Sequence, residues 1–372
     1  MSEAILVTGG AGYIGAHTAK TLAAAGFRPI VLDNLSQGHE EAVRWGPLVR
    51  GDVLDSGTVR DAIRSCNAAA VIHFAALAYV GDSVLHPAQY YRNNIAGTMS
   101  VLDAMRDTGC SQIVFSSTCA VYGQPAAMPI TEATPPEPIN PYGRTKLACE
   151  HMMRDYGLAY GIRSICLRYF NAGGADPDGE IGELHDPEPH LIPRALMAAL
   201  GELPDFAVFG ADYPTPDGTA IRDYIHVTDL ALAHLAALRL LLGGHATDVF
   251  NLGAGQGASV LEVLDTISRV TGCSLPPALG ARRPGDPAIL VADAGRAQAT
   301  FGFTPALSDI ETIIRTAFAW QLSQRGLTKR YHVPEEMRLD PKPRGLNTDA
   351  ETMARKGPVA PSRLRLRKAE SS

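Results

Sequence analysis

Short apolar runs alternate with longer amphipathic stretches through the first half of the chain. The first run, Ala-Ile-Leu-Val at residues 4–7, is typical of a strand that is buried on both faces of a sheet. Further strands are predicted at 29–32, 47–50, 69–73, 112–115 and 163–168, and helices at 13–25, 57–65, 87–106 and 142–156. This alternation predicts an α/β fold, a doubly wound parallel sheet with helices on both faces.

The pattern loosens beyond residue 171, where Gly, Pro and Asp cluster at 173–189 and 210–218. Such clusters are typical of loops. A strand at 247–252 and helices at 260–271 and 307–323 follow. We therefore predict a first domain over 1–172, with segments near 219–254 returning to it, and a smaller, loop-rich α/β substrate domain over 173–326. Residues 327–372 carry prolines, a basic cluster and few large apolar residues, which predicts a disordered tail.

Composition narrows the class of protein. Of the 372 residues, 46% are hydrophobic and 19% charged, which is ordinary for a folded soluble protein. The net charge of −6 gives no reason to expect a nucleic-acid partner, and no apolar run is long enough to span a membrane. The six cysteines are scattered and no spacing indicates zinc, so we expect reduced thiols and no metal. The chain enters a glycine loop almost at once, which leaves no room for a signal peptide and predicts a cytoplasmic location.

The first predicted strand runs into a glycine-rich turn. Gly9, Gly12 and Gly15 have the spacing G-x-x-G-x-x-G between a strand and a helix. In that context the spacing predicts a Rossmann dinucleotide site, because glycines allow a tight turn and a close approach of the backbone to a pyrophosphate at the helix N-terminus. Tyr13 and Ile14 in the same turn are predicted cofactor contacts.

An acidic residue ends the second predicted strand. Asp33 at that position would accept hydrogen bonds from the adenosine ribose and repel a 2′-phosphate, and its neighbour Asn34 is neutral. The cofactor is therefore predicted to be NAD rather than NADP. Residues at the ends of later strands are predicted to lie near the adenine and its ribose: Asp52, Val53, Phe74 and Ala75.

A row of hydroxyl side chains, from Ser116 to Thr118, ends a strand in the middle of the predicted sheet. Ligands of open parallel sheets bind beyond the carboxyl ends of the strands. Tyr142 and Lys146 would lie one turn apart on the same face of a following helix. A nearby ammonium and the positive nicotinamide ring both favour a phenolate, so Tyr142 is predicted as the base, with Thr118 as its partner and Ser116 beside the cofactor. The expected chemistry is proton removal from a hydroxyl coupled to hydride transfer to NAD.

These motifs resemble the extended short-chain dehydrogenase/reductase family and, over residues 4–325, its UDP-glucose 4-epimerase branch. The similar stretches are V-T-G-G-A-G-Y-I-G at 7–15, S-S-T-C-A-V-Y-G at 116–123, L-R-Y-F-N at 167–171, D-G-T-A-I-R-D-Y-I-H-V at 217–227 and N-L-G-A-G at 251–255. The resemblance is closest to epimerases of bacterial exopolysaccharide and envelope-sugar pathways.

The resemblance implies a UDP-sugar substrate and interconversion of UDP-glucose and UDP-galactose. Tyr142 would take the proton from the sugar 4-hydroxyl while the C4 hydride passes to NAD; the 4-keto sugar would then turn over and recover the hydride on its other face. By the same resemblance, Asn93 and Tyr169 line the cofactor. The implied nucleotide contacts are Asn171, Leu191, Phe209, Arg222, Arg283 and Asp286. A homodimer built by the helices near 87–106 and 142–156 is also implied.

Some positions depart from the family pattern and leave alternatives open. Leu290 stands at the position that gates sugar size, so a UDP-pentose or a UDP-N-acetylhexosamine is an alternative substrate. A nucleotide-sugar 4,6-dehydratase would need carboxylates where this chain has Cys119 and Ala120. A non-catalytic NAD-binding scaffold would have no need of Thr118 together with the Tyr–Lys pair.

Overall fold

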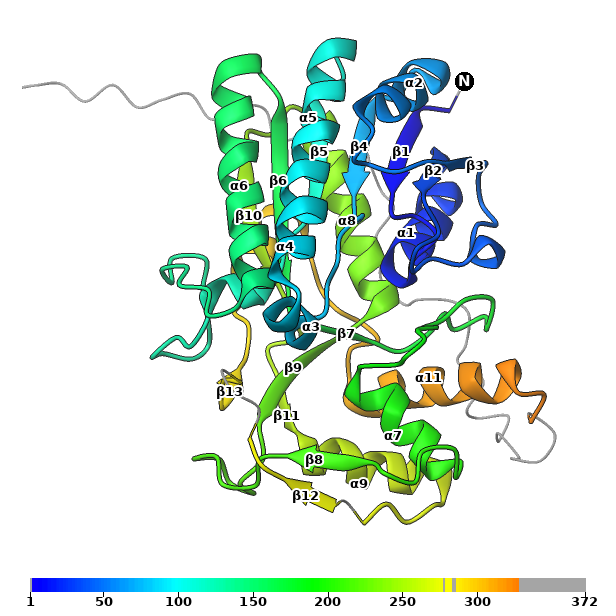
Figure 1. Cartoon of the computed structure of the whole chain (residues 1–372), viewed down its shortest axis with the longest axis vertical. Helices are drawn as coiled ribbons and strands as arrows, with labels where there is room; N and C mark the ends of the chain where they lie inside the picture. Colours follow the sequence, from blue (N-terminus) through cyan, green and yellow to red (C-terminus); the bar gives the residue numbers. More distant parts are fainter. Residues whose placement is uncertain (1, 277, 283–285, 328–372) are drawn as a thin grey trace, which may run out of the picture. The chain divides into compact units, whose positions relative to one another are not determined.

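A seven-stranded parallel sheet organises most of the chain (Figure 1). The computed structural model describes residues 2–276, 278–282 and 286–327. The strands run in the order β10-β6-β5-β4-β1-β2-β3. Their bounds are β1 Ala4–Thr8, β2 Arg28–Asp33, β3 Leu48–Arg50, β4 Ala70–His73, β5 Gln112–Ser116, β6 Arg163–Tyr169 and β10 Asp248–Leu252. The predicted doubly wound parallel sheet is confirmed.

Alternate residues of β1 explain why both faces of the sheet are covered. Ile5 and Val7 face a core shared with α1 (Tyr13–Ala24) and α8 (Val227–Leu242). Leu6 faces the opposite core, formed with α2 (Ser56–Cys66), α5 (Gly97–Thr108) and α6 (Pro141–Tyr160). Because side chains alternate along a strand, a continuous apolar run serves two cores at once.

The helix predicted at 87–106 is interrupted by a wider turn. It consists of α4 (Pro87–Tyr90), a π-helical turn η2 (Tyr91–Ala96) and α5. The turn contains Asn94, whose buried amide donates to Leu77 O and accepts from Leu77 N. These bonds hold the segment after β4, which continues into α3 (Val80–Leu85), near the sheet's carboxyl edge.

Helix α8 is absent from the elements predicted above. It is apolar around most of its circumference and buried along most of its length, so the amphipathic period that indicates a surface helix is weak. It packs against α1 and lies against strands β5 and β6. Helix α8 thus covers one face of the main sheet, and β10 extends the sheet at its edge beside β6.

The remaining strands form two smaller sheets. The first has the order β11 (Gly257–Ser259), β9 (Ile221–His226) and β13 (Ile289–Leu290), with β7 (Asn171–Gly173) pairing β9. The second pairs β8 (Ala207–Phe209) with β12 (Ala278–Gly280). Helices α7 (Leu191–Ala199), α9 (Val260–Thr271) and α11 (Ile310–Gln324) share a core with these strands.

Three short elements complete the described residues: 3-10 turns at η1 (Glu40–Ala42) and η3 (Cys119–Tyr122), and helix α10 (Gly295–Phe301). Among the described residues, no helix combines the length and the apolar character needed to cross a membrane. The predicted tail, apart from residue 327, lies outside the described residues.

Candidate active site

The glycine loop joins β1 to α1 and leaves the helix N-terminus open. Gly12 is the N-cap of α1, and no side chain caps the first turn. The first backbone N–H groups of a helix have no partner within the helix, so they point at whatever binds there. Tyr13 and Ile14 are the first two residues of α1, and their contact with a cofactor stays a prediction.

Glycine is suited to the three positions of the loop for different reasons. A Cβ on Gly15 would lie 2.2 Å from Gly9 O, and a Cβ on Gly9 would lie 2.6 Å from Ala75 N. Both positions are closed by the protein itself, and Gly9 also has φ of +71°. Gly12 is different, since a Cβ there would meet only Gly9 O at 3.3 Å. The open space beside Gly12 suits a phosphate group that approaches the backbone closely.

The predicted ribose acid, Asp33, is nine-tenths buried at the end of β2. Its two oxygens accept bonds from Ala11 N (3.0 Å) and Leu35 N (2.8 Å), which fixes the carboxylate beside the glycine loop. Asn34 donates to Asp52 at 3.0 Å, so these two predicted residues also lie together. A fixed anion at this place fits ribose hydroxyls and opposes a 2′-phosphate.

The other predicted cofactor residues are distributed along the same edge. Phe74 and Ala75 follow β4 and contact the glycine loop through the backbone beside Gly9. Val53 packs on Gly97 at the start of α5. Two side chains are already engaged with the protein: the Tyr13 hydroxyl donates to Gly174 O at 2.6 Å and the Asn93 amide donates to Asn94 at 3.1 Å.

The Tyr–Lys helix begins where the sequence predicts. Pro141 occupies its first turn, and the Asn140 side chain accepts from Gly143 N at 2.8 Å as the N-cap. Tyr142 and Lys146 both lie on the buried face of α6. Thr118, which follows β5, lies close enough to the Tyr142 phenol for its hydroxyl to lower the pKa of that phenol. The structure therefore brings Thr118 and Tyr142 together from segments 24 residues apart in sequence.

Burial sets the ionisation of the pair. It raises the pKa of Tyr142 well above its usual value, and the nearby Thr118 hydroxyl opposes that rise. Burial also lowers the pKa of Lys146 to about 8. Desolvation is the largest effect on the pKa of Tyr142 in the protein alone, and the expectation that Lys146 and a bound nicotinamide ring together favour its phenolate stays a prediction. The Lys146 Nζ donates to Ser116 O at 2.7 Å and lies 4.9 Å from the centre of the Phe115 ring.

Ser116 and Tyr169 form a second hydroxyl pair at the ends of β5 and β6. Their oxygens are 2.6 Å apart, and burial raises the pKa of Tyr169 to about 12. Both residues are predicted cofactor contacts. The register sets Ser116 opposite Leu167, and the Tyr169 side chain, two residues further on, reaches back to the Ser116 hydroxyl.

A buried network behind the site was missed by the sequence interpretation. Glu150, one turn after Lys146, accepts from the Ser117 hydroxyl and pairs with Arg168, whose Nε donates at 2.9 Å. Arg168 also donates to the Tyr122 hydroxyl at 2.9 Å, which donates to Asn251 at 2.6 Å. The network joins α6, β6, β10 and η3. The only local sign of this network in the sequence is the spacing of four residues between Lys146 and Glu150, which places both on one face of α6.

The predicted nucleotide contacts lie mainly on the smaller sheets and their helices. Arg222 on β9 forms an ion pair with Asp286, and Leu290 pairs with Arg222 in the strand register. Leu290 packs in a cluster with Val121 and Tyr122. The other predicted contacts are placed as follows: Asn171 starts β7, Leu191 starts α7, and Phe209 ends β8 and is 42% exposed. Arg283 lies outside the described residues.

The fold and the site together define a dinucleotide-binding α/β protein with a Thr–Tyr–Lys set at the carboxyl edge of its sheet. The model of the NAD dependent epimerase/dehydratase family matches residues 5–253, and the chain belongs to that family.

The chain is similar to known proteins over most of their length. A UDP-glucose 4-epimerase of Rhizobium meliloti (strain 1021) is 49% identical over 316 residues, which is 85% of this chain and 96% of that protein. The crystal structure of UDP-glucose 4-epimerase from Brucella ovis in complex with NAD is 56% identical, with a TM-score of 0.83 over 85% of this chain and 98% of that one. A UDP-glucose-4-epimerase from Stenotrophomonas maltophila, solved with bound NAD and formylated UDP-arabinopyranose, is 38% identical, with a TM-score of 0.84 over 87% of this chain and 99% of that one. The resemblance drawn from the motifs is confirmed.

Proposed function

We propose that this protein interconverts UDP-glucose and UDP-galactose by inverting carbon 4 of the sugar. The observation that carries the proposal is the gathering of buried Thr118, Tyr142 and Lys146 at the carboxyl edge of the sheet, in a chain whose glycine loop has room for a pyrophosphate. The named activity of relatives that this chain covers almost completely supports the same choice.

The residues would divide the work as follows. NAD, when bound, accepts the hydride from carbon 4 and returns it. The glycine loop and the α1 N-terminus would hold its pyrophosphate, and Asp33 its adenosine ribose. Tyr142 would take the proton of the sugar 4-hydroxyl, and Thr118 would hold that oxygen in place. Lys146, a buried cation at neutral pH, would favour the phenolate form of Tyr142.

The sugar nucleotide would be held by the smaller sheets. Arg222 sits beside Asp286 and is 88% buried, which suits a guanidinium that pairs with phosphate oxygens. After oxidation, the 4-keto sugar would turn about its link to the diphosphate and present its other face to the returning hydride. No net oxidation results, so a preparation that turns over UDP-galactose should accumulate no NADH.

Elimination chemistry is the weaker alternative. A 4,6-dehydratase needs an acid and a base next to the hydroxyl residue, where this chain has Cys119 and Ala120. Burial raises the pKa of the Cys119 thiol to about 12, so it is a poor proton donor and stays neutral near pH 7. Assays with UDP-galactose, UDP-GlcNAc and UDP-xylose, each with product identification, test the proposal. Formation of a 4-keto-6-deoxy product, or no UDP-glucose from UDP-galactose, would refute it.

The adenosine acid offers a test of cofactor choice. Replacing Asp33 by Asn removes a charge that would repel a 2′-phosphate by about 4 kcal/mol at 4 Å in partly screened surroundings. We expect the preference for NAD over NADP to fall more than about tenfold, as measured by the dissociation constants of both cofactors. Asp61→Asn, which removes an exposed carboxylate from α2, should leave the preference unchanged. An unaltered preference in Asp33→Asn would contradict the ribose role.

Sugar size offers a second test. By resemblance Leu290 gates the space at carbon 2, and it is 8% exposed within its cluster. Leu290→Ala should raise kcat/KM for UDP-GlcNAc relative to UDP-glucose by about tenfold, because the lost carbons leave room for the N-acetyl group. Ile289→Ala, which shortens the side chain at the neighbouring position of β13, is the control. If the ratio of kcat/KM for UDP-GlcNAc to that for UDP-glucose were the same in both variants, Leu290 would not control the size of the sugar.

We also propose a cytoplasmic homodimer that serves galactose or exopolysaccharide metabolism. Exposed apolar side chains on the two helices expected at the interface support the dimer: Tyr91, Met99, Leu158 and Tyr160. Light scattering coupled to gel filtration measures the mass in solution.

A further inference from the structure

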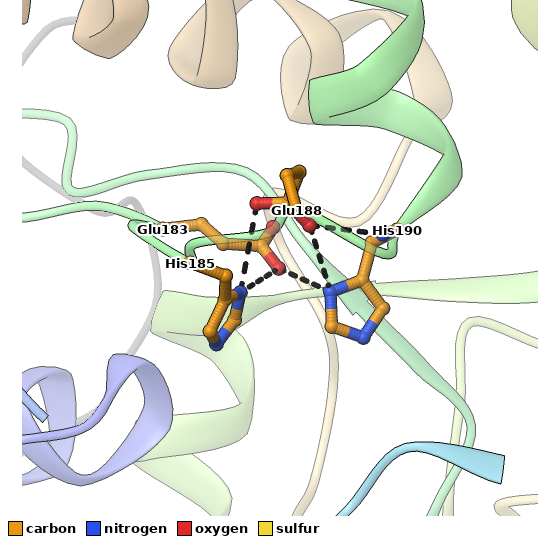
Figure 2. A group of neighbouring side chains, drawn as sticks. All are labelled: Glu183, His185, Glu188 and His190. Carbon is orange, nitrogen blue, oxygen red and sulfur yellow. Dashed lines mark hydrogen bonds and ion pairs between the residues drawn. The ribbon is translucent and has the colours of Figure 1, made fainter. Parts of the chain in front are cut away.

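Four potential metal ligands come from one eight-residue segment that leads into α7. Glu183, His185, Glu188 and His190, here called the His–Glu cluster, point toward one another (Figure 2). One ligand atom from each lies within 4.8 Å of the others. By resemblance His190 stands near the substrate diphosphate, and the reaction proposed above assigns no role to the other three side chains.

The spacing of the ligand atoms is that of a small coordination shell. Nδ1 of His190 lies 2.6 Å from a Glu183 oxygen and 3.2 Å from a Glu188 oxygen. Nδ1 of His185 lies 3.1 Å and 3.5 Å from oxygens of the same two carboxylates. Zinc bonds to nitrogen and oxygen of about 2.0–2.2 Å place the corners of a tetrahedron about 3.4 Å apart. Two nitrogens and two carboxylates therefore surround a point at which a dication would fit after a small outward shift.

Ion pairing alone leaves the cluster incompletely bonded. Each histidine turns the same nitrogen toward two carboxylates, but one N–H can donate well to only one of them. The buried Nδ1 of His185 has no hydrogen bond of acceptable geometry, although a Glu183 oxygen lies 3.1 Å away. In the part of the chain that the structure describes, the ion pairs of the Glu183 and Glu188 side chains involve these two histidines only.

A neighbouring acidic group shows the contrast. Asp176, Asp178 and Glu180 also gather closely, but the Lys20 ammonium sits among them at 2.7–2.8 Å from each. That group already holds a permanent cation. The His–Glu cluster instead combines neutral-capable imidazoles with carboxylates, which is the donor set that zinc accepts in proteins.

We propose that the His–Glu cluster binds one divalent transition metal, best matched by zinc, through two histidine nitrogens and two carboxylates. The carboxylate side chains are 9% and 8% exposed, whereas the His190 side chain is 47% exposed and provides the way in. Tyr79 orients both imidazoles, with its ring edge-on at 5.7 Å from His185 and 5.9 Å from His190 between ring centres.

The role that follows is positional. Trp320 holds the segment from the other side, since its indole N–H donates to Glu183 O at 3.1 Å. His190 is the N-cap of α7, directly before Leu191. A bound metal would fix the segment 183–190 as one closed loop and so fix the start of α7.

The experiment is metal binding by the untagged full-length protein after treatment with a chelator. Zinc, titrated alone against a chromophoric competitor, should bind with one equivalent per chain, and cobalt in its place should give the visible bands of a tetrahedral ion. His185→Gln and His190→Gln should each weaken zinc binding by about 100-fold or more. His245→Gln, a histidine paired with Asp248 at 3.2 Å on another surface, is the matched control and should bind as the wild type does.

Further measurements separate loss of zinc binding from loss of folding or of enzymatic activity. Circular dichroism checks each variant, and Glu188→Gln provides a second ligand change in case a histidine variant fails to fold. Zinc should raise the Tm of the wild type and of His245→Gln but not of the ligand variants. Equal zinc affinity in wild type, His185→Gln and Glu188→Gln, or no zinc binding by the wild type, would overturn the proposal and leave a cluster of ion-paired, protonated histidines. Because binding is measured without sugar nucleotide, this result stands apart from the proposed epimerase activity.

Discussion

Replacing Tyr142 by Phe is expected to lower kcat for UDP-galactose about 100- to 10,000-fold, the usual contribution of a positioned acid–base group. The hydroxyl removed is the one whose pKa the nearby Thr118 hydroxyl lowers, at the carboxyl edge of the sheet. The phenylalanine ring keeps the packing on the buried face of α6, so the dissociation constant for UDP should change less than about threefold. Steady-state kinetics and calorimetry with UDP measure the two quantities.

The control for this prediction lies on the same helix. Tyr156 donates its hydroxyl to Asp103 at 2.9 Å, away from the hydroxyl row. Tyr156→Phe removes the same atom from α6 and should keep kcat within about threefold of the wild type. If Tyr142→Phe retained near-wild-type turnover, Tyr142 would not be the base, and if both variants fell together the loss would belong to the helix rather than to the phenol.

Gly12→Ala is expected to remove the cofactor while leaving the fold intact. Its Cβ would meet only Gly9 O at 3.3 Å in the protein, but it would fill the space that a pyrophosphate needs. Loss of two hydrogen bonds to a charged phosphate costs about 3 kcal/mol, or roughly 100-fold in affinity. The NAD content of the protein after gel filtration should therefore fall. The free energy of unfolding of the cofactor-free protein, measured in urea, should change by less than about 1 kcal/mol.

Two other glycines bracket this result. Gly15→Ala places a methyl group 2.2 Å from Gly9 O, so the unfolding free energy should fall by more than about 3 kcal/mol before any cofactor is considered. Gly81→Ala on α3 meets nothing within 4 Å and should change neither property. Retention of NAD by Gly12→Ala would show that the pyrophosphate does not lie against this residue.

The local pattern of the chain was enough for most of the main sheet. The strands that begin at Ala4 and Gln112 and helix α9 lie where their apolar periods indicate, because each element is specified by neighbours within a few residues. Helix α8 was missed for the opposite reason. A helix buried on nearly all sides has no polar face, so its sequence carries little of the period that distinguishes a helix.

The candidate site divides in the same way. Gly9 to Gly15 and the pair Tyr142 and Lys146 are recognisable in sequence, since turn geometry and one helical turn constrain residues within six positions. The ion pair of Arg222 with Asp286 joins residues 64 apart, which come close because β13, just after Asp286, pairs with β9. The sequence interpretation named both residues by resemblance but had no means to pair them.

The sequence by itself therefore determined the alternation of strands and helices and the dinucleotide turn, and it named the residues proposed for proton transfer, because these features depend on local backbone geometry. Only the tertiary structure decided which distant side chains meet. It placed Glu150 against Arg168 behind the site, and it closed the segment 183–190 into the His–Glu cluster that the sequence interpretation had counted as a loop without metal. The physical reason is that strand pairing and loop closure bring side chains together in space, and the distance between two residues along the chain does not tell whether they meet.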